Sequence, residues 1–144
     1  MKHYDLLQTY LANINVFNTK LLNLHWNVVG MQFVRYHELT EEIHDILAEQ
    51  IDEVAEALKM RHVYPLSTLA EYVEASTIEE VKAKDFTAEE VVAVLNADLN
   101  TMKALATEIR NTADEAGDFE VVANFEDYTT VYSKYIWFAE AMAK

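Results

Sequence analysis

The sequence contains no cysteine, a single proline and two glycines among its 144 residues. Without cysteine the chain has no disulfide bonds and no thiolate metal ligands, which fits a reducing cytosol. Residues that break helices are scarce, and 51% of the residues are hydrophobic, in long patterns with a period near 3.6. We therefore predict an all-α protein, folded as one domain over residues 1–144.

Basic residues are also scarce, because 11 lysines and arginines face 25 aspartates and glutamates, for a formal net charge of −14. Nucleic-acid binding normally relies on clusters of basic side chains that neutralise phosphates, so DNA is not an expected partner. An acidic surface instead attracts cations and raises their local concentration. The sequence has neither a signal-peptide pattern nor an apolar run of about 18 residues, so we expect a soluble, cytoplasmic protein without a membrane partner.

Apolar residues recur at steps of three and four along four segments, which predicts four long amphipathic helices. These segments are residues 4–29, 35–62, 87–110 and 119–142. Gly30 is expected to end the first helix, and the short turn after it makes the first two helices antiparallel. The acidic segment 111–118 contains Gly117 and is expected to be a loop.

The connection between the second and third helices is long and contains the only proline, Pro65. A short helix is predicted within it over residues 67–74. The pattern Thr-x-x-Glu, which typically caps a helix, predicts a further small turn at residues 77–80 and the start of the third helix at residues 87–90. Four-helix bundles with one long crossover here are ferritin-like, so we predict a ferritin-like four-helix bundle with a short helix in the long connection.

The second helix carries a stripe of metal-binding residue types, namely His37, Glu41, Asp52 and Glu56. At about 100° and 1.5 Å per residue, all four share one sector of the helix, but Asp52 lies about 22 Å along the axis from His37. Ligands of one metal ion must converge within a few ångströms. Either the two ends of the helix have unrelated roles, or the metal lies between two chains paired antiparallel about a two-fold axis.

His25, at the edge of the apolar face of the first helix, is the other candidate ligand. Imidazoles and carboxylates together suit non-haem iron, with manganese and zinc as competitors. The simpler alternative for His25 is a core histidine satisfied by a hydrogen bond. For the stripe on the second helix, it is an acidic face exposed to solvent. The acidic face has few compensating basic residues, and like charges one turn apart repel unless a cation joins them. Trp26 is first interpreted as a packing residue.

Two other motifs are present in the second helix. Residues 41–44 form a Glu-x-x-His unit, but a di-iron bundle needs two such units, and no histidine follows His62. An intrachain di-iron centre is therefore not expected. Residues 37–41 begin like a zinc-protease helix, but Glu41 replaces the second histidine, so we set that hypothesis aside.

Several motifs in order and spacing resemble the Dps family, the mini-ferritins. They are Leu24-His25-Trp26-Asn27, Gly30, Phe33, His37-Glu38, Asp52-Glu53-Val54-Ala55-Glu56, Pro65, Ser67-Thr68-Leu69 and Ile136-Trp137. The resemblance implies a hollow dodecamer built from two-fold dimers, with iron-oxidising sites at the two-fold interfaces. By position, one subunit supplies His25, His37 and Glu41, and its neighbour supplies Asp52 and Glu56. Trp26 would then pack beside this centre and quench one-electron oxidants.

The chain departs from the family pattern at several positions, one of which argues against DNA binding. It begins Met1-Lys2-His3-Tyr4, without the lysine-rich tail through which several relatives bind DNA. Arg61-His62 replaces a glycine pair, and Tyr135 stands where histidine is frequent. Three acidic residues, Asp114, Glu115 and Asp118, resemble the lining of the family's ion pores. His44 and Asp45 are either additional ligands or surface residues.

The sequence thus predicts an iron-storage and detoxification protein. We expect a ferroxidase that oxidises Fe(II) with hydrogen peroxide, or with O2, and stores ferric mineral in the shell. Such an activity would protect against oxidative stress, because it removes both reagents of the Fenton reaction. The alternatives are a non-catalytic acidic helical oligomer that binds divalent cations and a DNA-compacting Dps protein.

Overall fold

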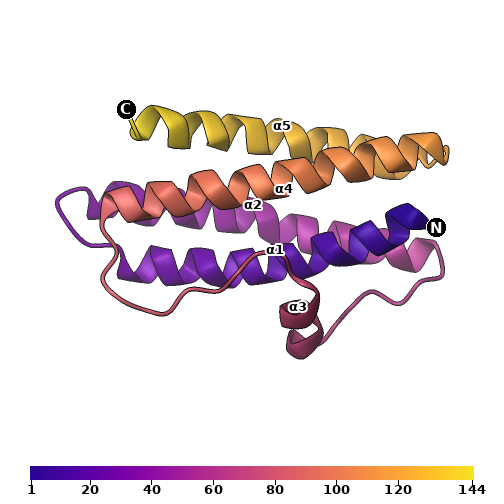
Figure 1. The fold of residues 1–144 in the computed structure, drawn as a ribbon, viewed down its shortest axis with the longest axis horizontal. Coiled ribbons are helices and arrows are strands. Elements are labelled where there is room, and N and C mark those ends of the chain that lie inside the picture. The colour runs from indigo at the N-terminus through magenta and orange to yellow at the C-terminus, as the bar shows by residue number, and fades with distance from the viewer.

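The computed structural model describes residues 1–144 and contains five helices and no strand (Figure 1). The helices are α1 (Lys2–Asn27), α2 (Phe33–Met60), α3 (Leu69–Ala75), α4 (Ala88–Glu115) and α5 (Phe119–Met142). The four long helices lie side by side, and α3 sits in the long crossover between α2 and α4. The predicted all-α, ferritin-like four-helix bundle is therefore confirmed. None of the helices combines the length and apolar character needed to cross a membrane.

The two ends of the bundle carry different parts of the chain (Figure 1). One end holds the N-terminus, the end of α2 and the turn between α4 and α5. The other end holds the turn between α1 and α2 and the C-terminus. The crossover is fastened to this second end, because Val29 N–H donates to the Phe86 carbonyl and Phe86 N–H donates to the Asn27 carbonyl. The start of α4, two residues after Phe86, is thus held beside the end of α1.

The core contains a hydrogen-bonded polar cluster among its apolar side chains. Tyr10 Oη donates to Gln50 Oε1 at 2.5 Å and lies 2.5 Å from Tyr132 Oη, so that α1, α2 and α5 are joined. Burial raises the pKa of both tyrosines, which keeps the hydroxyls neutral. A buried ion pair of 2.7 Å between Lys20 and Asp98 connects α1 to α4. These contacts fix the relative positions of the four long helices.

Two predicted helix ends are wrong. α1 ends at Asn27 and Val28 is extended, because this segment pairs with Phe86 instead of continuing the helix. The segment 111–118 is mostly helical, since α4 runs to Glu115, where Arg110 and Asp114 form an i,i+4 ion pair of 3.4 Å. Only residues 116–118 connect α4 to α5, and Gly117 adopts a left-handed φ of 72° there.

The capping pattern at residues 77–80 does not start a helix. The Thr77 hydroxyl accepts from Asn13 Nδ2 at 2.8 Å, and Thr77 N–H donates to Asn13 Oδ1 at 2.7 Å. The threonine is therefore engaged by α1, and the chain bends here. The pattern at residues 87–90 does form a capping box, as predicted. A further box, made by Thr68 and Glu71, begins α3.

A network around Asp118 closes the N-terminal end of the bundle. His3 Nε2 lies 2.9 Å from Asp118 Oδ2, and Arg61 donates from Nε to Oδ2 at 2.7 Å and from Nη2 to Oδ1 at 2.5 Å. The Arg61 hydrogen bonds outweigh desolvation and lower the pKa of Asp118 to about 2. Asp118 resembles, with Asp114 and Glu115, the acidic lining of the family's ion pores. Its carboxylate is paired with His3 of α1 and with Arg61, just after α2, whereas the side chains of Asp114 and Glu115 are exposed.

Substituting Asp118→Asn should destabilise the protein at neutral pH. The difference between a pKa of 3.8 in the unfolded chain and about 2 in the folded chain corresponds to about 2 kcal/mol. Because the folded pKa is the lower one, this contribution is complete above about pH 4 and is lost as the pH falls through about 2. In urea unfolding, the difference in unfolding free energy between wild type and Asp118→Asn should be smaller at pH 3 than at pH 7. An equal loss of unfolding free energy in Asp114→Asn, which changes an exposed aspartate, would contradict this account.

Candidate metal centre

His25 and His37 meet where α1 ends and α2 begins. Their rings are stacked, with centroids 3.8 Å apart and an interplanar angle of 12°, and Phe33 covers the His37 ring at 5.0 Å. His25 Nδ1 lies 2.5 Å from the His37 carbonyl oxygen, and His37 Nδ1 lies 2.8 Å from the His25 carbonyl oxygen. A carbonyl oxygen only accepts, so each Nδ1 carries the hydrogen and donates. Each Nε2 therefore presents its lone pair.

This reciprocal arrangement is typical of metal-binding histidines. A histidine ligand usually donates its other ring N–H to a carbonyl or carboxylate, which fixes the tautomer and the ring orientation. His25 is buried, with 9% of its surface exposed, and His37 is half-buried. The hydrogen bond expected of a core histidine is present, but it uses Nδ1 only. Neither Nε2 atom has a hydrogen-bond partner in the chain, so both are available to a metal ion.

Thr40 supports the pair and was not singled out from the sequence. Its side chain is fully buried, and its hydroxyl donates to the Tyr36 carbonyl at 2.8 Å. The same oxygen lies 3.3 Å from His25 Nδ1. The only signal in the sequence was a small polar residue three positions after His37 on the side of α2 that faces α1. Threonine at a buried helix position is too common to indicate a site by itself.

The carboxylates lie elsewhere on α2. Glu41 is exposed one turn after His37, and Asp52 and Glu56 are exposed one turn apart in the second half of the helix. A hydrogen bond and charge repulsion from Asp52 raise the pKa of Glu56. Such a pair attracts a cation, because a bound cation relieves the repulsion.

One chain alone does not assemble the predicted ligands. α2 is continuous over 28 residues, so Asp52 remains about 22 Å along its axis from His37. The structure brings His25 and His37 together and leaves Asp52 and Glu56 at the far half of α2. Within residues 1–144 no three histidine, aspartate or glutamate side chains are placed to hold one metal ion. The chain therefore offers two half-sites, one of imidazoles and one of carboxylates.

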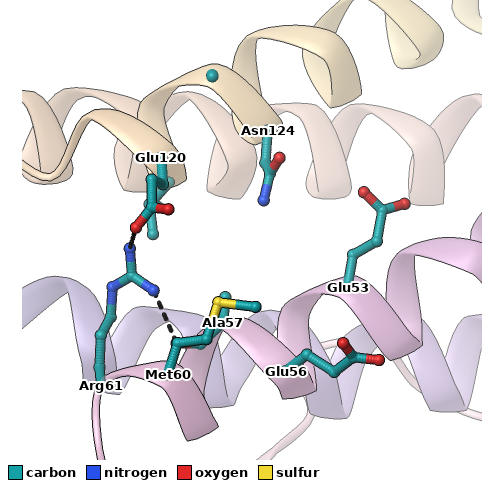
Figure 2. A pocket seen from close by; sticks show the side chains of 9 residues that line it. Glu53, Glu56, Ala57, Met60, Arg61, Glu120 and Asn124 are labelled. Atoms are coloured by element: carbon teal, nitrogen blue, oxygen red, sulfur yellow. Dashed lines mark hydrogen bonds and ion pairs between the residues drawn. The ribbon is translucent and has the colours of Figure 1, made fainter.

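Glu56 lines a pocket of about 390 Å³ between the second half of α2 and the start of α5. Figure 2 shows Glu53 directed toward α5, whereas the Glu56 carboxylate stays on the α2 side. Arg61 is already paired with Asp118 and contacts Glu120 at 3.3 Å across this pocket. Glu56 forms no ion pair with a basic side chain of the chain, and its neighbour Asp52 carries the same charge.

Trp26 does not pack in the core, which corrects the interpretation of this residue within the chain. Its side chain is 65% exposed although it follows His25 directly. The same short segment exposes further large apolar residues, namely Val29, Met31, Phe33 and Val34. Apolar side chains gathered on a surface in this way mark contact sites for a partner.

The architecture, a four-helix bundle with one long crossover, is ferritin-like, and the comparisons with known proteins agree. A family model described as ferritin-like domain matches residues 4–144. The chain is 30% identical to the DNA protection during starvation protein of Helicobacter pylori, over 98% of both chains. Among crystal structures, it is similar to Helicobacter cinaedi CAIP, with a TM-score of 0.96 and 32% identity over 99% of both chains. The chain therefore belongs to the Dps family of ferritin-like proteins.

A further structural relative connects this family with metal chemistry. The Dps protein of Vibrio cholerae O1 has a TM-score of 0.94 and 28% identity, over 99% of this chain and 89% of that one. It is described as a member of a broad superfamily of ferritin-like diiron-carboxylate proteins. Proteins of this class are ferroxidases in general, and Dps proteins form homo-oligomers. Membership of the family supports iron storage and protection against oxidative stress as the function of the chain.

Proposed function

We propose that the protein is a ferroxidase whose sites are shared between two subunits of a dodecameric shell. The observation that carries this proposal is the pair of free Nε2 atoms on the stacked rings of His25 and His37, about 22 Å along α2 from Asp52. An antiparallel dimer joins the half-sites. His25, His37 and Glu41 come from one subunit, and Asp52 and Glu56 come from the other, with iron as the substrate.

The face of α2 between the half-sites fits a close helix–helix contact. Ala48, Ile51 and Ala55 lie within about 40° of His37 around the helix, on the same side. Ala48 is exposed, and the other two are half-buried. Small side chains allow two helices to approach to the usual interaxial distance of about 8–10 Å. The acidic stripe is therefore interrupted where two copies of α2 would touch.

The residues of the site suit the oxidation of Fe(II). Neutral Nε2 donors bind Fe(II), and the carboxylates stabilise the higher charge of Fe(III). Each Fe(II) gives up one electron, and hydrogen peroxide accepts two electrons and two protons to leave as two molecules of water. The net charge of −14 concentrates Fe(II) near the shell. Trp26, exposed beside His25, is placed to pack against the partner subunit and to intercept one-electron oxidants.

Anaerobic titration with Fe(II) followed by peroxide tests this proposal. We expect a ferric absorbance that is stoichiometric with the added iron, forms faster with peroxide than with O2 and stays soluble with the protein. A non-catalytic acidic oligomer would bind Fe(II) but oxidise it no faster than buffer does. Absence of the ferric product at saturating Fe(II) and peroxide would exclude the ferroxidase and favour that second function.

DNA binding is a separate question, because relatives in Helicobacter pylori and Brevibacillus brevis are called DNA protection during starvation proteins. This chain has 11 basic residues against 25 acidic ones. Phosphate contacts need clustered positive charge and weaken with salt. We expect no gel retardation of duplex DNA near pH 7, even at low salt. A retarded complex that disappears as salt is added would contradict this expectation.

A further inference from the structure

The antiparallel dimer of the proposed function fixes which residues face each other across the two-fold axis. If His37 of one subunit faces residues 52–56 of the other, the midpoint of the pairing lies at about residues 44–47. Residues near the midpoint lie next to their own copies in the partner subunit. His44 is within about 4 Å of the axis along α2, at 1.5 Å per residue. Seven residues separate it from His37, so it lies about 20° from His37 around the helix, on the same face.

His44 is already oriented as a metal ligand would be. Its Nδ1 lies 3.0 Å from Asp45 Oδ1. A carboxylate only accepts, so Nδ1 donates its hydrogen and Nε2 keeps its lone pair. Histidine ligands in proteins are commonly held by a carboxylate in this way. The His44 side chain is 25% exposed, so Nε2 is accessible from the surface of α2.

One chain places only His44 and Asp45 together, and no third ligand joins them within residues 1–144. The two-fold axis brings two His44 imidazoles together, each with its Nδ1 donating to its own Asp45. Ala48, one turn further along and small, leaves room for the facing imidazoles. Two imidazole nitrogens, with water in the remaining positions, suit a four-coordinate divalent transition ion such as Zn²⁺.

We propose that the His44 imidazoles of two subunits, each oriented by its own Asp45, form a second metal site on the two-fold axis, which takes one divalent transition ion of the Zn²⁺ class per dimer. The site lies about 10 Å along α2 from His37 and is therefore distinct from the ferroxidase centre. An ion bound by both subunits stabilises the dimer over the separate chains, because only the dimer offers both imidazole ligands. The proposal depends on the antiparallel pairing of the proposed function and not on the ferroxidase reaction.

Counting bound Zn²⁺ tests the site, with wild type, His44→Ala and the matched control His62→Ala, which removes an exposed histidine outside α2. Competition with a chromophoric chelator should show that His44→Ala binds about half an ion per chain fewer than the other two proteins, as one ion per two-fold dimer requires. The rate of ferroxidation should be unchanged in His44→Ala. Equal Zn²⁺ stoichiometry in all three proteins would overturn the proposal.

A disulfide trap tests the placement of His44 independently, because the chain has no cysteine of its own. Helices in contact at about 8–10 Å, with Cα atoms about 2.3 Å from each axis, bring facing Cα atoms within about 6 Å, which a disulfide can span. Mild oxidation of His44→Cys should give a covalent dimer, and Glu49→Cys, on another face of α2, should not.

The two tests separate this proposal from the proposed function. A covalent dimer with unaltered Zn²⁺ binding in His44→Ala would refute the metal site and support the pairing. If His44→Cys forms no covalent dimer but oxidises Fe(II) normally, the proposed register of the two α2 helices is refuted, and with it the axial metal site. The proposed ferroxidase function would be unaffected. Loss of half an ion per chain in His44→Ala, in a protein that forms no ferric product, would support the axial site and refute the ferroxidase.

Discussion

Replacing both His25 and Asp52 by alanine is expected to slow peroxide-dependent Fe(II) oxidation by about 100-fold or more. Loss of a group that merely orients a metal ligand costs about 10–100-fold in affinity or activity, and these residues are proposed as ligands themselves. His25→Ala also removes the hydrogen bond that fixes the His37 carbonyl and the ring stacked at 3.8 Å on His37. Stopped-flow measurement of the ferric absorbance gives the rate directly.

The matched control for this experiment is the double variant His62→Ala with Glu49→Ala. It also removes one histidine and one carboxylate, and both positions are exposed. The net charge therefore changes equally while the proposed ligands are kept. Size-exclusion chromatography shows whether both double variants still assemble. If an assembled His25→Ala/Asp52→Ala protein oxidises Fe(II) at the control rate, these residues do not form the ferroxidase site.

Local signals in the sequence predicted the helices well where neighbouring residues decide the structure. α5 spans residues 119–142 as predicted, and α4 begins at the predicted capping box of Thr87 and Glu90. The failures lie where distant segments compete. Thr77 is engaged by Asn13, 64 residues away, and Val28 and Val29 are drawn out of α1 by pairing with Phe86. Periodicity and capping patterns carry no information about such partners.

The candidate site was predictable to a similar extent. The resemblance to the Dps family assigned His25 and His37 to the same half of a site, and the structure brings them together. Their reciprocal Nδ1 hydrogen bonds were not predictable, because these depend on the packing angle between α1 and α2. The exposure of Trp26 was also missed, since a large aromatic residue next to an apolar stripe is usually buried.

The length of α2 explains why the proposed site needs two chains. Twenty-eight residues in one unbroken helix hold the imidazole and carboxylate half-sites far apart. The exposed apolar segment around Trp26 and the uncompensated charges of Asp52 and Glu56 are both unfavourable in an isolated chain. The proposed antiparallel pairing would cover the exposed apolar segment and would bring Asp52 and Glu56 beside the free Nε2 atoms of the partner subunit. A stable monomer in dilute solution that still oxidised Fe(II) would be incompatible with this explanation.

Complementation between two inactive chains tests the shared site most directly. His37→Ala and Asp52→Ala should each be inactive alone, because every site then lacks one ligand. In a mixed dimer one site carries both defects, whereas the other takes His37 from one chain and Asp52 from its partner and is intact. Random association of equal amounts leaves about a quarter of all sites intact. Co-expressed chains should therefore regain about a quarter of the wild-type rate of Fe(II) oxidation, and no recovery in mixed shells of normal size would contradict a site built from two subunits.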